Sequence, residues 1–205
     1  MTTYLRYLLL ILCFPLSVLI GPSAVSAAEK ASQRPNILFL FSDDQRADAL
    51  GAYQNPHIQT PNLDQLAHAG FSFRNAYCMG SIHGAVCQPS RAMLNSGRSL
   101  YHVPMDLKGV MTMPQLLKES GYTTFGTGKW HNHRDSFQKS FTLGTAAFMG
   151  GMSNHLKVPV VDFKDGKFEN KRMGEKFSSE LFVDATVNFL KTQPADKPFY
   201  AYVAF

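Results

Sequence analysis

The chain has 205 residues and a formal net charge of +5, with 20 Lys and Arg residues against 15 Asp and Glu residues. The basic excess is mild and contains no run of Lys or Arg, so nucleic acid is not expected as a partner. An anionic small substrate is compatible with this charge, and the length suffices for one domain with a substantial core.

Residues 1 to 28 have the three parts of a secretory signal peptide. Arg6 supplies the positive charge, Leu8 to Ile20 form the apolar part, and the small residues 24 to 28 offer a cleavage site. A permanent anchor needs about 20 apolar residues and no cleavage site, so we expect no stable membrane anchor, and an uncleaved anchor is the alternative. We expect export to the periplasm or the extracellular space, or a lysosomal or secretory location in a eukaryote, with residues 29 to 205 as the mature part.

The first apolar run of the mature part, Asn36 to Phe41, lacks alternation, which is typical of a parallel strand covered on both faces. Asp43 and Asp44 follow it directly, although adjacent carboxylates repel each other near a core of low dielectric constant. Ligands of open α/β sheets collect beyond the carboxyl ends of strands, so the pair is compatible with a site for Ca²⁺ or Mg²⁺. The alternative is a solvated turn in which Asp44 pairs with Arg46.

The segment from Thr60 to Gly70 has the start and stop signals of a helix. Thr60 is the predicted N-cap, Pro61 suits the first helical position, and Gly70 is the predicted end. One face of this helix is apolar and carries Leu63, Leu66 and Ala67.

A second helix is predicted after Thr112. Thr112 is the expected N-cap, Gln115 has the spacing of a capping box, and Gly121 ends the helix before a strand at residues 122 to 125. The side chains expected to be buried are those of Leu116 and Leu117.

The rest of the chain favours an α/β layered domain, because apolar strands alternate with helices. Residues 142 to 176 have no clear period, which predicts loops and a short hairpin around residues 164 to 167. A helix is expected from Ser179 to Leu190 and a last strand from Pro198 to Phe205. The expected core face of that helix consists of Leu181, Phe182, Ala185 and Phe189.

Cys87 and Cys78 are the two cysteines of the mature part, and a local disulfide between them is one interpretation. Another follows from Pro89, which suits the first turn of a helix and would place Cys87 just ahead of a helix N-terminus. That position favours an anion and makes a thiol reactive. Arg91, one turn along, can reach back to hold an anionic oxygen.

Several motifs together resemble those of the type I sulfatases, members of the alkaline phosphatase superfamily. The family's Cys-X-Pro-Ser-Arg motif is the signal for converting its cysteine to formylglycine, and a second stretch has the form Gly-Lys-Trp-His. The matching stretches here are Asp43-Asp44-X-Arg46, Thr60 to Asp64, Cys87-X-Pro89-Ser90-Arg91, Gly97-Arg98, Gly128-Lys129-Trp130-His131 and Pro198 to Phe205. The resemblance implies a mostly parallel central sheet with helices on both faces, incomplete at the C-terminus.

The resemblance also implies a metal and a modified nucleophile. Asp43, Asp44 and a hydroxyl of the converted Cys87 would bind Ca²⁺, with Mg²⁺ as the alternative. An aldehyde hydrate at position 87 offers two geminal hydroxyl groups, of which one attacks sulfur and releases the alcohol. Deprotonation of the other hydroxyl then expels sulfate and restores the aldehyde. A formylglycine-generating maturation enzyme is an implied partner.

The remaining implied site residues are Arg91, Lys129 and His131, which would surround the sulfate group and neutralise its charge. The implied activity is that of a sulfuric ester hydrolase acting on a sulfated small molecule or glycan. The nearby His133 and His155 are expected to be structural or merely exposed, because no motif includes them.

The chain departs from the family pattern because the family's further metal ligands, histidine and lysine have no counterpart before Phe205. Residues 29 to 205 are therefore expected to be the N-terminal part of a sulfatase catalytic domain, to bind calcium poorly alone and to be essentially inactive. The alternatives are a phosphonate or phosphate monoester hydrolase of the same superfamily and a non-catalytic truncated product.

Overall fold

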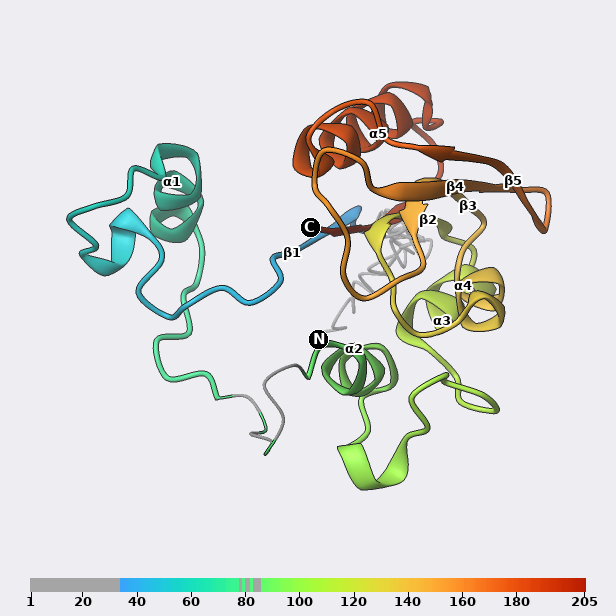
Figure 1. Cartoon of the computed structure of the whole chain (residues 1–205), viewed down its shortest axis with the longest axis horizontal. Helices are drawn as coiled ribbons and strands as arrows, with labels where there is room; N and C mark the ends of the chain where they lie inside the picture. The colour runs from blue at the N-terminus through green and yellow to red at the C-terminus, as the bar shows by residue number, and fades with distance from the viewer. Residues whose placement is uncertain (1–33, 78, 80–81, 83–85) are drawn as a thin grey trace, which may run out of the picture. The chain divides into compact units, whose positions relative to one another are not determined.

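The computed structural model describes residues 34 to 77, 79, 82 and 86 to 205 (Figure 1). These residues all belong to one compact unit, Arg34–Phe205. The predicted leader and Cys78 lie outside the described residues. Among the helices of the described part, none is both long and apolar enough to span a membrane.

The described unit is built on a six-stranded sheet in which the strand order is β1-β6-β2-β3-β4-β5. The strands β1, β6, β2 and β3 are parallel, whereas β4 and β5 form an antiparallel hairpin at one edge. Their bounds are Ile37–Phe41 for β1, Thr123–Lys129 for β2, Leu143–Phe148 for β3, Pro159–Lys164 for β4, Lys167–Met173 for β5 and Phe199–Ala204 for β6. The mostly parallel sheet expected from the sequence is confirmed.

Helices cover both faces of the sheet, with α5 on one face and α2, α3 and α4 on the other (Figure 1). The α-helices are α1 (Pro61–Ala69), α2 (Cys87–Ser96), α3 (Met113–Glu119), α4 (Arg134–Ser140) and α5 (Ser178–Thr192), and short 3-10 helices lie at Gly51–Tyr53 and Leu100–His102. Side chains of β6 alternate between the two layers, since Tyr200 and Tyr202 join one core cluster and Ala201 joins the other. This alternation is the period of a β-strand.

Aromatic contacts dominate both layers of the core. Trp130 is fully buried and makes edge-to-face contacts with Phe141 and Tyr202, whose ring centres lie 5.3 and 5.6 Å away. On the opposite face, the ring of Phe125 stacks on that of Phe189 at 4.4 Å. Large buried rings contribute most of the apolar area that stabilises such a core.

The strand β1 is parallel to β6, as expected, but it is not covered on both faces. It lies at the edge of the sheet, and the side chains of Leu38 and Leu40 are each 47% exposed. The apolar face of α1 is likewise exposed in the described unit, with Leu63 44% and Leu66 62% accessible. An unbroken apolar run therefore does not by itself establish burial on two sides.

The cap of α3 is confirmed, because the Thr112 side chain accepts a hydrogen bond from the Gln115 backbone N–H at 3.2 Å. The capping box is not completed, since the Gln115 amide donates to Glu119 at 3.0 Å instead. Leu116 was expected to be buried but is exposed, and Leu117 is only partly buried. The helix packs through other side chains, among them the buried Pro114.

The strand β2 continues to Lys129, four residues beyond the predicted end, through Gly126 and Gly128. Residues 142 to 148, predicted as loop, instead contain β3, and α4 before them was not predicted at all. The hairpin turn after Lys164, the helix α5 and the last strand β6 are confirmed within one or two residues. The longer β2 matters for function, because it places Lys129 at the end of a strand instead of in a loop.

Candidate active site

The candidate site lies where the parallel strands β1, β6 and β2 reach their carboxyl ends. Asp43 and Asp44 follow the end of β1, Lys129 is the last residue of β2, and Phe205 follows β6. Because β6 pairs with both β1 and β2, these three ends meet at one edge of the sheet. This is the edge at which α/β proteins bind their ligands.

A cavity of about 400 Å³ occupies this edge. Four predicted site residues line it: Asp43, Asp44, Cys87 and Lys129. The other lining residues come from the end of β3 and the segment after it, the start of α5 and the residue after β6: Phe148, Gly151, Met152, Ser153, Asn154, His155, Val158, Ser178, Ser179, Phe182 and Phe205. The size falls in the range of small-molecule sites.

Cys87 is the first residue of α2, with Val86 as N-cap, so the helix begins earlier than predicted. Pro89 occupies the third helical position and still falls in the first turn, where its missing N–H costs little. Cys87 is a free and partly exposed cysteine in the described part of the chain. The disulfide interpretation cannot be followed to Cys78, which lies outside the described residues.

The carboxylate of Asp43 is held between two cations. Lys129 Nζ donates to Asp43 Oδ2, and Arg91 Nη2 lies 3.7 Å from Asp43 Oδ1. The Lys129 side chain is 10% exposed and that of Asp43 27%, so the pair is largely shielded from water. Charges in such surroundings interact more strongly than they would at an open surface.

Arg91 lies behind this pair and does not line the cavity. Its side chain is fully buried, and Nη1 donates to the Lys129 carbonyl and to the Tyr202 hydroxyl, 3.0 Å away. The guanidinium also lies 4.8 Å from the centre of the Phe41 ring, a cation–π distance. Arg91 therefore joins the ends of all three strands, whereas its predicted contact with an anionic oxygen of the substrate stays a prediction.

Gly128 allows Lys129 to reach this place. Its φ is +76°, and a Cβ atom there would lie 1.7 Å from the carbonyl oxygen of Ala204. Only a residue without a side chain tolerates both the left-handed conformation and this close approach.

His131 lies two residues after β2, and its ring is packed against Gly151. A Cβ on Gly151 would lie 2.3 Å from both Cε1 and Nε2 of the ring. Burial lowers the pKa of His131, the positive charges of Lys129 and Arg91 lower it further, and Asp43 partly opposes them. The imidazole is thus held in its neutral form near pH 7.

The residues predicted to bind a metal meet only in part the needs of a hard cation. Asp43 and Asp44 supply two adjacent carboxylates at the cavity, which is the donor chemistry that Ca²⁺ and Mg²⁺ prefer. Arg46 pairs with Asp48 at 3.0 Å rather than with Asp44. Within the described residues, however, no group of three or more His, Cys, Asp or Glu side chains is arranged to hold a metal. The metal assignment stays a prediction.

Two features in and beside the cavity were not predicted from the sequence. His155, expected to be structural or exposed, is exposed and also lines the cavity, with its Nδ1 2.7 Å from Ser178 Oγ. Asn132, adjacent to the predicted His131, is fully buried. The Gly-rich composition around His155 gave no period from which this wall could be found.

These observations define an α/β protein with a charged small-molecule site at the carboxyl edge of a mostly parallel sheet. The Sulfatase family model matches residues 35–205, and the chain belongs to this family.

Several curated relatives of the chain carry the names of sugar sulfatases, and a bovine relative is named arylsulfatase A. N-acetylglucosamine-6-O-sulfatase of Bacteroides thetaiotaomicron is 29% identical over 199 residues, which cover 92% of this chain and 33% of the relative. Human N-acetylgalactosamine-6-sulfatase is 30% identical over an alignment of 215 positions, gaps included, that covers 86% of this chain and 40% of the relative. The chain therefore spans between a third and two fifths of the length of these two sugar sulfatases.

Solved structures share the fold. A protein solved in complex with its substrate D-glucosamine-2-N,6-O-disulfate has a TM-score of 0.65 and 26% identity, covering 83% of this chain and 34% of that one. A Pseudoalteromonas sulfatase has a TM-score of 0.69 at 19% identity, over 87% of this chain and 45% of that one. The second similarity concerns the fold alone.

Proposed function

We propose that the protein is a sulfuric ester hydrolase that cleaves sulfate monoesters at the cavity of β1, β2 and α2. The observation that carries the proposal is the meeting of Cys87, Lys129 and the Asp43-Asp44 pair at one cavity in a chain of the sulfatase family. Cys87 is the proposed site of conversion to formylglycine by a maturation enzyme. Export through the predicted leader, residues 1 to 28, is part of the same proposal.

The proposed role of Lys129 is to neutralise a non-bridging oxygen of the sulfate. Charge on these oxygens must be balanced in the transition state, and a preorganised cation in a shielded site does this effectively. The bond from Lys129 to Asp43 and the bond from Arg91 to the Lys129 carbonyl support this role, because they fix both ends of the residue. Arg91 would act mainly by holding Lys129 and Asp43 in place.

His131 is the proposed proton-transfer group. Its pKa is lowered by burial and by the neighbouring cations, so near pH 7 it is neutral and can accept a proton. The imidazolium formed in this way can then return the proton to the oxygen of the leaving alcohol.

Asp43 and Asp44 are the proposed protein ligands of a Ca²⁺ ion. When bound, the ion would supply positive charge next to position 87 and polarise a sulfate oxygen. Ca²⁺ takes about 6 to 8 oxygen ligands, so two carboxylates with the hydroxyl of a converted Cys87 are a partial set. Water or groups beyond the described residues would complete the shell.

The proposed substrate class is a sulfated sugar. The cavity lining combines polar groups, among them Asn154 and His155, with the apolar Met152 and Phe182. Sugars present hydroxyl groups and apolar C–H faces, so both kinds of surface can be used. The sugar sulfates named for three similar proteins support this choice, while another relative is named arylsulfatase A, so aryl sulfates are tested beside them.

The test is mass spectrometry of the Cys87 peptide after co-expression with a formylglycine-generating enzyme. We expect the peptide to be lighter by the difference between a thiol and an aldehyde, and Cys87→Ala to abolish sulfate ester hydrolysis. Cys78→Ala is the matched control and should remain active. An unmodified thiol in a fully active enzyme, or a disulfide between the two cysteines, would contradict the proposal.

Because residues 29 to 205 alone are expected to be essentially inactive, turnover and substrate preference are tested on a full-length version of the protein with sugar sulfates, aryl sulfates, phosphate esters and phosphonates. Preference for a phosphorus ester by more than about 100-fold, equal to roughly 2.7 kcal/mol of barrier, would favour the phosphorus hydrolase alternative. If none of these substrates is hydrolysed although Cys87 has been converted, the alternative of a non-catalytic truncated protein is favoured.

A further inference from the structure

Asn132 makes two hydrogen bonds that link separate segments of the chain. Its side chain is fully buried, and Nδ2 donates to the carbonyl oxygens of Gln88, at 3.0 Å, and Met105, at 2.7 Å. Both neighbours are acceptors, so only the amide nitrogen can face them, which fixes the orientation of the side chain. Asn132 Oδ1 has no hydrogen-bond partner among the described residues.

The bond to Gln88 connects the two halves of the candidate site. Gln88 follows Cys87 in the first turn of α2, while Asn132 follows His131 and lies three residues beyond Lys129. The backbone that carries the nucleophile is thereby tied directly to the backbone that carries the cation and the imidazole. Among the described residues, the bond from Arg91 to the Lys129 carbonyl is a second link between α2 and residues 129 to 133, and the Asn132 bond is the one that reaches the turn next to Cys87.

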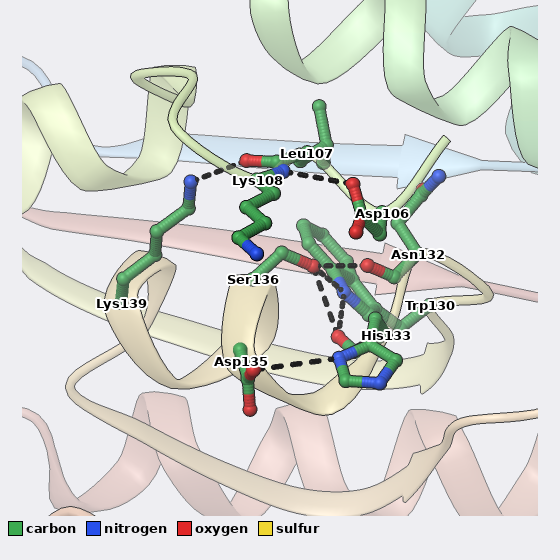
Figure 2. A network of polar contacts seen from close by, with 9 residues as sticks. All are labelled: Asp106, Leu107, Lys108, Trp130, Asn132, His133, Asp135, Ser136 and Lys139. Atoms are coloured by element: carbon green, nitrogen blue, oxygen red, sulfur yellow. Dashed lines mark hydrogen bonds and ion pairs between the residues drawn. The ribbon is translucent and has the colours of Figure 1, made fainter. Parts of the chain in front are cut away.

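The segment around Asn132 is itself held firmly, as Figure 2 shows. Trp130 Nε1 donates to the His133 carbonyl at 3.0 Å and to the Ser136 hydroxyl at 2.9 Å. The Ser136 hydroxyl in turn lies within hydrogen-bond distance of the carbonyl oxygens of Asn132 and His133. His131 and His133, on either side of Asn132, both have positive φ, 64° and 76°. These bonds help to hold the turn in this conformation, and the one from Trp130 to the His133 carbonyl does not depend on Ser136.

We propose that Asn132 is a positioning residue that fixes the first turn of α2, and with it residue 87, relative to Lys129 and His131. The proposal rests on the proposed function for the roles of those three residues. A misplacement of about 1 Å can cost a reaction as much as about 100-fold in rate, so a buried bond at this point affects turnover without touching substrate.

Asn132→Leu tests the proposal, because leucine has a similar shape but no donor. In unconverted protein, we expect iodoacetamide to alkylate Cys87 about fivefold faster, the factor that corresponds to one typical hydrogen bond. Digestion and mass spectrometry separate Cys87 from the other cysteines. In converted enzyme, kcat for a sulfate ester should fall about 10-fold or more while KM changes little.

Ser136→Ala is the matched control. It removes a hydroxyl from the same buried network but leaves the bond between Asn132 and Gln88 intact. Each variant is compared at the same interval below its own Tm, which removes the effect of general destabilisation. Ser136→Ala should keep the alkylation rate of Cys87 and kcat within about twofold of the parent protein.

The proposal is overturned if Cys87 of Asn132→Leu is alkylated at the rate of the parent protein. It is also overturned if Ser136→Ala changes the alkylation rate and kcat as much as Asn132→Leu does. Should Asn132→Leu fail to fold, Asn132→Ser carries the same test, since its side chain is too short to span both carbonyl groups. The alkylation readout needs no turnover. If Asn132→Leu speeds the alkylation of Cys87 but the converted protein hydrolyses no sulfate ester, the positioning role is supported and the proposed function is contradicted. If the converted protein hydrolyses sulfate esters but Asn132→Leu leaves the alkylation rate unchanged, the proposed function is supported and the positioning role is contradicted.

Discussion

The strands β1 and β2 both end at the candidate site, but the sheet holds them differently. β2 lies between β6 and β3, and all seven of its residues are buried. Among the described strands β1 pairs with β6 alone, and no described residue covers much of Leu38 and Leu40, which are half exposed. The cationic half of the site therefore belongs to the best-packed part of the molecule, and the carboxylate half belongs to an edge.

The charged residues of the site are therefore held in position to different degrees. Lys129 and the backbone around it are fixed by the pairing of β2 with β6 and by the buried Arg91 of α2. Asp43 is placed by its ion pairs with Lys129 and Arg91. Changes in β2 should therefore damage the whole domain, whereas changes in β1 should act locally.

The largest effect is expected from Gly128→Ala. A methyl group there would overlap the Ala204 carbonyl at 1.7 Å, so β2 and β6 would have to separate. We expect a loss of more than about 4 kcal/mol of unfolding free energy, or no folding. Gly109→Ala is the control, because Gly109 has a similar φ of +68° but no atom within 4 Å of the added methyl group. It should cost only about 1 to 2 kcal/mol. Urea denaturation measures both, and equal losses would show that the strand contact is not the cause.

Core truncation tests the contrast between the two strands directly. Phe125→Ala in β2 removes a fully buried ring stacked on Phe189 and should cost about 3 to 5 kcal/mol. Leu40→Ala in β1 removes a half-exposed side chain and should cost less than about 1 kcal/mol. Chemical denaturation of the two variants provides the comparison. A large loss for Leu40→Ala would mean that the outer face of β1 is covered in solution.

Gly151→Ala should affect turnover rather than stability. The new methyl group would meet the ring of His131 at 2.3 Å, so the imidazole must move. We expect kcat/KM for a sulfate ester to fall at least about 10-fold. Gly166→Ala, in the hairpin turn with no atom within 4 Å, should leave the activity unchanged. If Gly151→Ala has the same kcat/KM as the parent protein, the proposed proton-transfer role of His131 is contradicted.

The smallest effect concerns pH. The pKa of His131 is lowered in the folded protein, so below pH about 6.5 the unfolded chain binds a proton that the folded protein does not. The contribution of neutral His131 to the free energy of unfolding is fully present above that pH. It decreases as the pH falls toward the pKa of His131 in the folded protein. His131→Gln should therefore lose less Tm than the parent protein between pH 7.5 and 5. His57→Gln, at an exposed position, is the control, and parallel curves for His131→Gln and the parent would contradict the expectation.

The sequence motifs identified four of the side chains that share the cavity, for a reason that lies in the geometry of sheets. Asp43 directly follows a strand, and Cys87 begins a helix, so both could be placed at the same sheet edge before the structure was known. The roles of these residues in catalysis remain predictions. Arg91 was placed in the site by its motif, but its burial behind Asp43 depends on contacts with Tyr202 and Lys129 that are distant in sequence.

Other features could not be predicted because they depend on tertiary packing. Gly126 and Gly128 have low strand propensity, yet β2 needs them, since the rings of Phe137 and Phe141 fill the space beside Gly126. The wall that carries His155 has no period of its own and is positioned by its bonds to the start of α5. Leu38 illustrates a different failure. The apolar run from Asn36 to Phe41 predicts a strand buried on both faces, but the side chain of Leu38 is half exposed.

The two edge strands of the described sheet differ in how readily they accept a foreign strand. β5 has the sequence KFENKRM, and six of its seven residues are exposed, four of them charged. A strand that docked against β5 would bring its side chains beside these charges, which opposes intermolecular pairing. β1 offers a free backbone edge flanked by leucine side chains instead. Aggregation by strand addition should therefore begin at β1, and a lysine in place of Leu38 is the change we expect to suppress it.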